Sequence, residues 1–141
     1  TINMVTKKPL DETRAGFQLS LGSFKTTRAT AAVTGPLNED KTLLYRLNVG
    51  YENSGSFRDF VTFKTLAVAP SLSFVPSAKT RINVDLNFQD INTVLDRGRT
   101  VFQGEQNLTA TPINFNLTQP GDFLRPKIFS ATLSWAQKLS E

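Results

Sequence analysis

The most constraining feature of this sequence is a period-two alternation of apolar and polar residues. Residues 44–52 place an apolar side chain at every second position, and residues 81–89 repeat the pattern. Successive side chains of an extended strand point to opposite faces of a sheet, so this alternation predicts strands with one apolar and one polar face. Similar runs lie at residues 17–22, 27–33, 66–74 and 129–135. The chain is therefore predicted to be all-β, an antiparallel up-and-down meander of about six strands.

Strand length and the spacing of the turns favour a membrane barrel over a soluble domain. At roughly nine to eleven residues, the clear runs match the length that crosses a bilayer at a tilt. Compact turns at residues 35–40 and 76–79 alternate with longer connections at residues 53–63 and 90–126. Short turns opposite long loops are typical of outer-membrane barrels. Pro70 lies inside one run, where its missing N–H predicts a bulge or a break in the pairing.

A soluble β-sandwich or a lipocalin-like binding barrel would produce the same alternation, so the chemistry of the two faces has to separate these alternatives. The polar face carries Asn, Asp, Arg, Gln and Ser in nearly every run, which suits a water-filled lumen. The apolar face carries Tyr, Phe and Trp toward the ends of the runs, which suits the aromatic girdles at a membrane surface. We therefore predict that the strands form part of a large transmembrane β-barrel.

The composition excludes several kinds of chemistry. The sequence has no cysteine and no histidine, which removes zinc fingers, thiolate nucleophiles and a histidine base. Its carboxylates are scattered and form no acid–base pair, so we predict that the chain is not an enzyme. A net charge of +4, with cations spread along the chain, gives no reason to expect a nucleic-acid partner. The sequence has no apolar run of about 18 residues, which excludes a membrane-spanning helix.

Several blocks of the sequence resemble one protein family. The string TINMVTKKP at residues 1–9 resembles the end of the plug domain in TonB-dependent outer-membrane siderophore receptors. Residues 33–61 and 69–88 resemble the first barrel strands of the same family. Asp-Arg-Gly at residues 96–98 and Gln-Pro-Gly-Asp-Phe at residues 119–123 continue the similarity in the family's order. The resemblance therefore covers almost the whole chain.

The resemblance implies the organisation and function of a receptor. Residues 1–10 would be the C-terminal end of the plug domain, and residues 11–141 the N-terminal part of the β-barrel. The implied protein is a multi-pass β-barrel of the bacterial outer membrane, in contact with outer-membrane lipid. It would bind a ferric siderophore and import it by active transport, with energy from TonB-ExbB-ExbD arriving through the part of the plug that lies outside this sequence. Iron would enter only as the bound ferric chelate, so no resident cofactor or metal is expected.

Other functions are compatible with the same residues. One alternative is a TonB-dependent receptor that takes up another cargo or relays a signal. A second alternative is a soluble β-barrel binding protein. The sequence does not identify the siderophore, because most of the plug and most of the loops that would select it lie outside the chain.

Two sets of residues are candidates for function. The polar side chains on the lumen side are expected to contact the plug: Arg46, Asn48, Asn83, Asp85 and Asn87. The long connection at residues 90–126 is expected to be extracellular, and surface loops on a rigid scaffold commonly carry binding groups. Its cations and aromatic rings suit the anionic oxygens and the organic shell of a chelate. The ligand-binding candidates are Arg97, Arg99, Phe102 and Phe115. The alternative is that these residues only order the loop or cover the plug.

Overall fold

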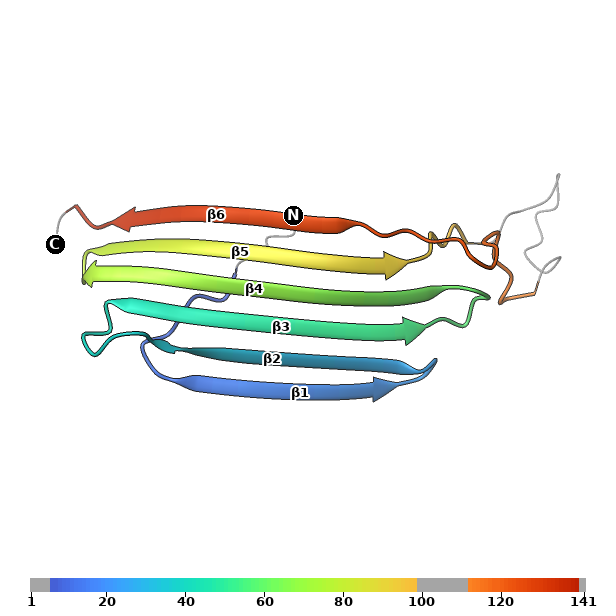
Figure 1. The fold of residues 1–141 in the computed structure, drawn as a ribbon, viewed down its shortest axis with the longest axis horizontal. Coiled ribbons are helices and arrows are strands. Elements are labelled where there is room, and N and C mark those ends of the chain that lie inside the picture. The colour runs from blue at the N-terminus through green and yellow to red at the C-terminus, as the bar shows by residue number, and fades with distance from the viewer. Residues whose placement is uncertain (1–5, 99–111, 140–141) are drawn as a thin grey trace.

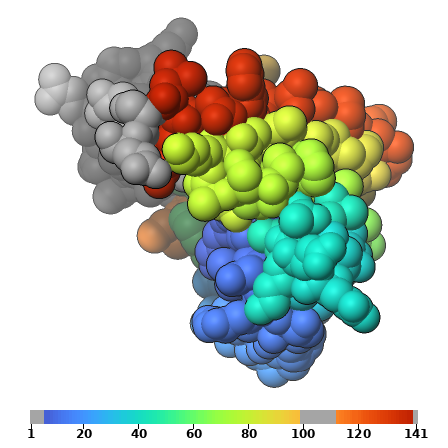
Figure 2. All heavy atoms as spheres, turned by 90° about the vertical axis from the view of Figure 1, so that its left-hand side faces the viewer, coloured from blue at the N-terminus to red at the C-terminus, as the bar shows by residue number. Residues whose placement is uncertain are grey.

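The alternating segments of the sequence form one antiparallel sheet in the computed structural model, which describes residues 6–98 and 112–139 (Figure 1). The strands are β1 (Arg14–Gly22), β2 (Thr26–Pro36), β3 (Leu43–Gly55), β4 (Thr62–Ser77), β5 (Thr80–Thr93) and β6 (Lys127–Gln137). They pair in the order β1-β2-β3-β4-β5-β6. Figure 2 looks from the end that carries the β2–β3 and β4–β5 turns, and its colours follow the chain order across the sheet. The predicted meander of about six strands is confirmed. Within the described residues, no helix is long and apolar enough to cross a membrane.

The pairing register places the apolar positions on one face of the sheet. Residues directly opposite each other in neighbouring antiparallel strands project to the same face. One row of apolar residues crosses all six strands: Phe17, Ala31, Val49, Val68, Phe88 and Phe129. A row on the other face is polar: Arg14, Thr34, Arg46, Ser71, Asp85 and Thr132. The predicted separation of the faces is confirmed, because Leu47 shares the first face and Asn83 and Asn87 share the second.

The apolar face is not covered by the described part of the chain. Phe17, Leu133 and Trp135 are 72%, 74% and 72% exposed. A stable protein does not leave an apolar face of this size in water. The face therefore requires a covering from outside the described residues, of the kind that lipid gives to a barrel.

The strands are longer than the alternation indicates. β3 has 13 residues, β4 has 16 and β5 has 14, so the two long connections shrink to residues 56–61 and 94–126. The first compact turn also begins later than predicted, because β2 continues to Pro36. Alternation fades toward the strand ends because both faces there contact water, whereas the backbone ladder continues. The predicted boundaries are therefore wrong by a few residues. The connection at residues 56–61 is no longer than the turn at residues 37–42, and the short β1–β2 turn lies at the same end as the β5–β6 connection (Figure 1). Of the predicted long loops, only the connection at residues 94–126 is long between the described strands.

Pro70 interrupts one of the two ladders of β4. The pairing of β4 with β5 is absent at Ala69 and Pro70 and resumes on both sides in the same register, because proline has no N–H to donate. The register shift of this strand pair, typical of a bulge, lies between Phe74 and Ser77 instead, around Pro76. The predicted break at Pro70 is confirmed, and the bulge belongs to the end of the strand.

Candidate functional site

The segment before β1 lies against the polar face of the sheet. The backbone N–H of Leu10 donates a hydrogen bond to Thr34 Oγ1 at 3.0 Å, and the Thr34 hydroxyl donates to the Tyr45 carbonyl at 2.9 Å. Thr34 is 3% exposed, and Pro9 is among the fully buried side chains. One hydroxyl of β2 thus pairs with the N-terminal segment and with β3, which satisfies polar groups that would otherwise be buried without partners.

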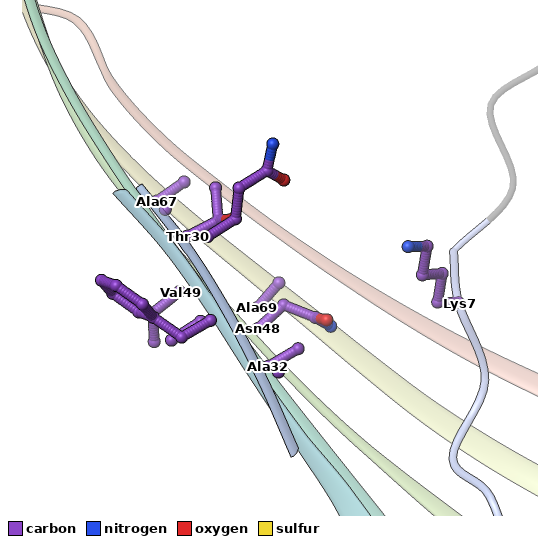
Figure 3. A pocket seen from close by; sticks show the side chains of 12 residues that line it. Lys7, Thr30, Ala32, Asn48, Val49, Ala67 and Ala69 are labelled. Carbon is purple, nitrogen blue, oxygen red and sulfur yellow. The ribbon is translucent and has the colours of Figure 1, made fainter. Parts of the chain in front are cut away.

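A cavity lies between this segment and the middle of the sheet. Figure 3 shows Lys7 on the side of the sheet to which Asn48 and Ala69 point, with Val49 on the opposite side. The cavity measures ≈ 510 Å³. Such a volume holds many water molecules, each of which needs polar partners. Lys7 and Asn48 supply such partners on the two sides of the space.

A second cavity brings together most of the residues expected to contact the plug. It measures ≈ 580 Å³, and its lining includes Thr6 and Lys7 from the N-terminal segment together with Asn48, Asp85 and Asn87 from the sheet. Lys7 and Asp85, which carry opposite charges, therefore line the same space. Opposite charges across a cavity attract each other even through water. The two amides add donors and acceptors to the wall of this space.

Side-chain hydrogen bonds join β4, β5 and β6 on the polar face. Ser73 Oγ donates to Asn83 Oδ1 at 2.6 Å, and Asn83 Nδ2 donates to Ser134 Oγ at 3.1 Å. The Ser71 hydroxyl donates to the Asp85 carboxylate. Ser73 and Asn83 are 0% and 2% exposed, so these bonds are needed to keep buried polar groups satisfied. Asn83 bonds to neighbouring strands, and its contact with the plug stays a prediction.

Arg46 and Asn48 form a pair along β3. Arg46 Nε donates to Asn48 Oδ1 at 3.1 Å, as residues two positions apart on a strand share a face. A guanidinium has further N–H donors, so Arg46 retains donors for other partners. The structure thus gathers Asn48, Asp85 and Asn87 around one cavity, places Arg46 next to it, and turns Asn83 toward the neighbouring strands.

The β3–β4 loop and the β5–β6 loop contact each other at one end of the strands. Arg58 Nε lies 3.2 Å from Asp96 Oδ2, which joins the β3–β4 loop to the start of the β5–β6 loop. Asn114 Nδ2 donates to both Asp59 carboxylate oxygens at 3.0 and 2.8 Å, and the Asp59 N–H donates to the Asn114 carbonyl at 2.9 Å. We call the contacts of Arg58, Asp59, Asp96 and Asn114 the loop clasp. The clasp ties the long β5–β6 loop to the β3–β4 loop.

Arg97 lies beside the clasp and is exposed. It lines a cavity of ≈ 300 Å³ together with Leu117, Asp122 and Phe123. A cation and an aromatic ring in one cavity can meet both the anionic oxygens and the organic shell of a chelate. Phe123 was not among the ligand candidates predicted from the sequence. Its position in the Gln-Pro-Gly-Asp-Phe block, which resembles the receptor family, was the signal that could have identified it.

Of the other ligand candidates, the structure describes Phe115. Phe115 is half-buried, and its N–H donates to the Pro112 carbonyl at 3.0 Å. It does not line the cavity that contains Arg97. Arg99 and Phe102 lie outside the described residues. Across the described part of the chain, no three Asp or Glu side chains come together as a metal site.

Comparison with known proteins identifies the family. No protein-family model matches the chain. The metal-pseudopaline receptor CntO of Pseudomonas aeruginosa is 40% identical over 98 residues, which make up 70% of this chain and 14% of that receptor. The ferripyoverdine receptor of the same organism is 32% identical over 90 residues, or 64% of this chain and 11% of the receptor. The chain belongs to the TonB-dependent outer-membrane receptors.

Solved structures have the same strand arrangement. The crystal structure of the ferripyoverdine receptor of the outer membrane of Pseudomonas aeruginosa, bound to ferripyoverdine, aligns with a TM-score of 0.73 at 23% identity over 92% of this chain and 17% of that one. FpvAI in its complex with pyocin S2 aligns with a TM-score of 0.59 at 30% identity, over 62% of this chain and 12% of the other. The fold is that of an outer-membrane β-barrel, which removes the soluble binding barrel as an alternative.

Membership of the TonB-dependent receptors assigns an environment to each face. The chain lies in the bacterial outer membrane, so the apolar face meets lipid and the polar face lines the barrel lumen. The chain spans about 14% of the length of CntO and 11% of the ferripyoverdine receptor. These relatives are receptors and not enzymes, which supports the prediction of a non-enzymatic function.

Proposed function

We propose that the receptor to which this segment belongs binds a ferric siderophore at the cell surface and imports it by TonB-coupled active transport. The observation that carries the proposal is the docking of the N-terminal segment on the polar face, where the Leu10 N–H bonds to Thr34 and Pro9 is buried. A barrel whose lumen holds part of its own chain is plugged. Cargo then passes only when the plug rearranges, and TonB-ExbB-ExbD would supply the work.

In this proposal the plug ends shortly before the first strand. Residues 1–10 are the C-terminal end of the plug domain, and residues 11–141 are the N-terminal part of the barrel. The burial of Pro9 and the start of β1 at Arg14 support this division. Asn48 and Asp85 would hold the plug through the cavity that they share with Lys7.

The long loop would supply contacts to the cargo. Arg97 lies on a cavity with an aromatic ring, and Arg99, Phe102 and Phe115 of the same loop would add cationic and aromatic groups. A hydrogen bond between an arginine and a charged oxygen contributes about 1.5 to 3 kcal/mol when water is excluded. The loop clasp supports this role, because a fixed loop loses less conformational entropy when the cargo binds. Iron is cargo in this proposal, and no resident cofactor takes part.

A second candidate cargo is a metal chelate other than a ferric one. The observation that favours it is the higher identity to the receptor for metal-pseudopaline, 40%, than to the receptor for ferripyoverdine, 32%. The cation and aromatic groups of the loop recognise the organic chelator and not the metal. The same site would therefore accept chelates of several metals with one chelator.

Uptake by cells that carry the intact receptor tests both cargo proposals. Cells expressing the receptor would be given one radiolabelled chelate at a time, prepared with iron, zinc, nickel or cobalt, with and without a functional TonB. The proposal predicts uptake of the ferric chelate in TonB-positive cells and surface binding without uptake in TonB-deficient cells. Uptake that persists without TonB would contradict active transport. Uptake of the zinc, nickel or cobalt chelate without uptake of the ferric chelate would contradict the ferric cargo and support the second candidate.

A further inference from the structure

Charged residues on the lipid-facing side gather at one corner of the sheet. Among the lipid-facing positions of the six described strands, charge occurs at Lys64, Asp90 and Lys127 alone. The register sets Lys64 opposite Asn92 and Asp90 opposite Lys127. Lys64 is the third residue of β4, Asp90 is the fourth from the end of β5, and Lys127 is the first of β6. These strand ends carry the β3–β4 and β5–β6 loops (Figure 1). The rest of the described lipid-facing strand surface is uncharged, so this corner differs from its surroundings.

Arg125 extends the same corner. The bridge between Thr93 and Leu124 continues the register of β5 and β6 beyond the last paired residues of the ladder. In that register Arg125 falls opposite Asn92, on the lipid-facing side. The Arg125 guanidinium lies over the Phe123 ring, 4.6 Å from its centroid, and this cation–π contact favours a fixed orientation of the guanidinium.

The corner lies at the depth of lipid headgroups. On β5 and β6 the last lipid-facing aromatic rings before the corner belong to Phe88 and Phe129, whose centroids are 4.8 Å apart. Eight positions of β4 separate Phe74, near the short-turn end, from Leu66. They span about 26 Å of strand, or roughly 20 Å of height at a tilt near 40°, comparable to the apolar band of about 25 Å in such barrels. Lys64 follows two positions beyond Leu66, just outside this band.

The cations of this corner are available to an anion. Lys64 forms no ion pair with any residue in the described part of the chain. Lys127 Nζ lies 3.7 Å from Asp90 Oδ2, with the two side chains 79% and 58% exposed, and an exposed pair of this kind holds its partners weakly. Arg125 adds a planar fork of donors that matches two phosphate oxygens.

We propose that Lys64, Arg125 and Lys127 bind the phosphate groups of a phosphorylated glycolipid in the outer leaflet of the membrane. Basic residues next to an apolar membrane surface attract anionic headgroups. Cations on β4, at the start of β6 and in the segment just before β6 can contact one phosphorylated headgroup together. A glycolipid fits better than a phospholipid because the corner lies at the long-loop end of the strands, which faces the cell exterior.

Titration of the intact purified receptor with lipid A tests the proposal. The probe is bis-phosphorylated lipid A with a fluorescent label, compared with the dephosphorylated form. The triple variant Lys64→Gln, Arg125→Gln, Lys127→Gln should bind the phosphorylated probe on the order of a hundredfold more weakly, at roughly fivefold for each cation removed. The dephosphorylated probe should bind both proteins equally and weakly. Heat-resistant migration on a gel verifies that the variant barrel is folded.

Controls separate this corner from a general effect of positive charge. The variant Lys41→Gln, Lys138→Gln removes two exposed cations at the other end of the strands. It should bind the phosphorylated probe as tightly as the native receptor. If the triple variant does not fold, Lys64→Gln alone should weaken binding about fivefold. Unchanged affinity in the folded variant, equal affinity of the native receptor for both probes, or equal competition by phosphatidylglycerol vesicles would each overturn the proposal.

Discussion

Replacing Thr34 with valine probes the contact between the N-terminal segment and the barrel wall. The change preserves the shape of the side chain but removes the hydroxyl that accepts from the Leu10 N–H at 3.0 Å and donates to the Tyr45 carbonyl at 2.9 Å. Because Thr34 is 3% exposed, water cannot readily replace the lost partner, and an unsatisfied buried group costs about 1 to 3 kcal/mol. The Leu10 amide should then exchange its hydrogen roughly 5 to 150 times faster.

Hydrogen exchange of the intact receptor, read by mass spectrometry on a peptide that contains residues 6–13, measures this effect. The matched control is Thr30→Val, which changes a second threonine on the same face of β2. Thr30 is half-buried and lines the cavity beside Lys7. Thr30→Val should leave exchange at Leu10 unchanged. Unchanged exchange in Thr34→Val, or equal acceleration in both variants, would refute the assignment of this hydroxyl as the docking group.

In the intact receptor, Leu47→Arg on the lipid face should cost about 2 to 4 kcal/mol of folding free energy at mid-bilayer depth, and Asn48→Arg on the lumen face much less, as measured by equilibrium unfolding in lipid. Equal costs would mean that the faces are assigned wrongly. Asp59→Ala should speed hydrogen exchange in both loops of the clasp, and unaltered exchange would show that other contacts hold them. Arg97→Ala with Arg99→Ala should weaken binding of the ferric ligand roughly ten- to a hundredfold in a titration on cells with matched receptor levels, and an unaltered dissociation constant would remove these residues from the site.

The sheet and its two faces were predictable because one physical requirement repeats along the chain. A wall between lipid and a wet lumen requires apolar and polar side chains at successive positions. The faces of residues such as Leu47 and Asn48 can therefore be assigned without knowledge of the strand pairing. The strand ends were less predictable. Both faces contact water there, and Asn53 continues β3 by backbone hydrogen bonds that its side chain does not reveal.

The contacts made by loops were not predictable from the sequence. Arg58 and Asp96 carry opposite charges in loops that follow nearby strands, but no period relates their positions, and their meeting depends on the conformation of both loops. Asn83 shows a related difficulty on the wall itself. Alternation places it on the lumen face, whereas only the register shows that its amide bonds to Ser73 and Ser134.

A cysteine scan of residues 44–52 in the intact receptor tests most directly that this segment is barrel wall between lipid and a plugged lumen. The segment has no cysteine of its own, so a fluorophore can be attached at one position at a time in outer-membrane lipid. A quencher dissolved in the lipid should reduce fluorescence at Tyr45, Leu47, Val49 and Tyr51 and leave the intervening positions unaffected. Quenching without a period of two, or strongest at Arg46 and Asn48, would contradict that assignment.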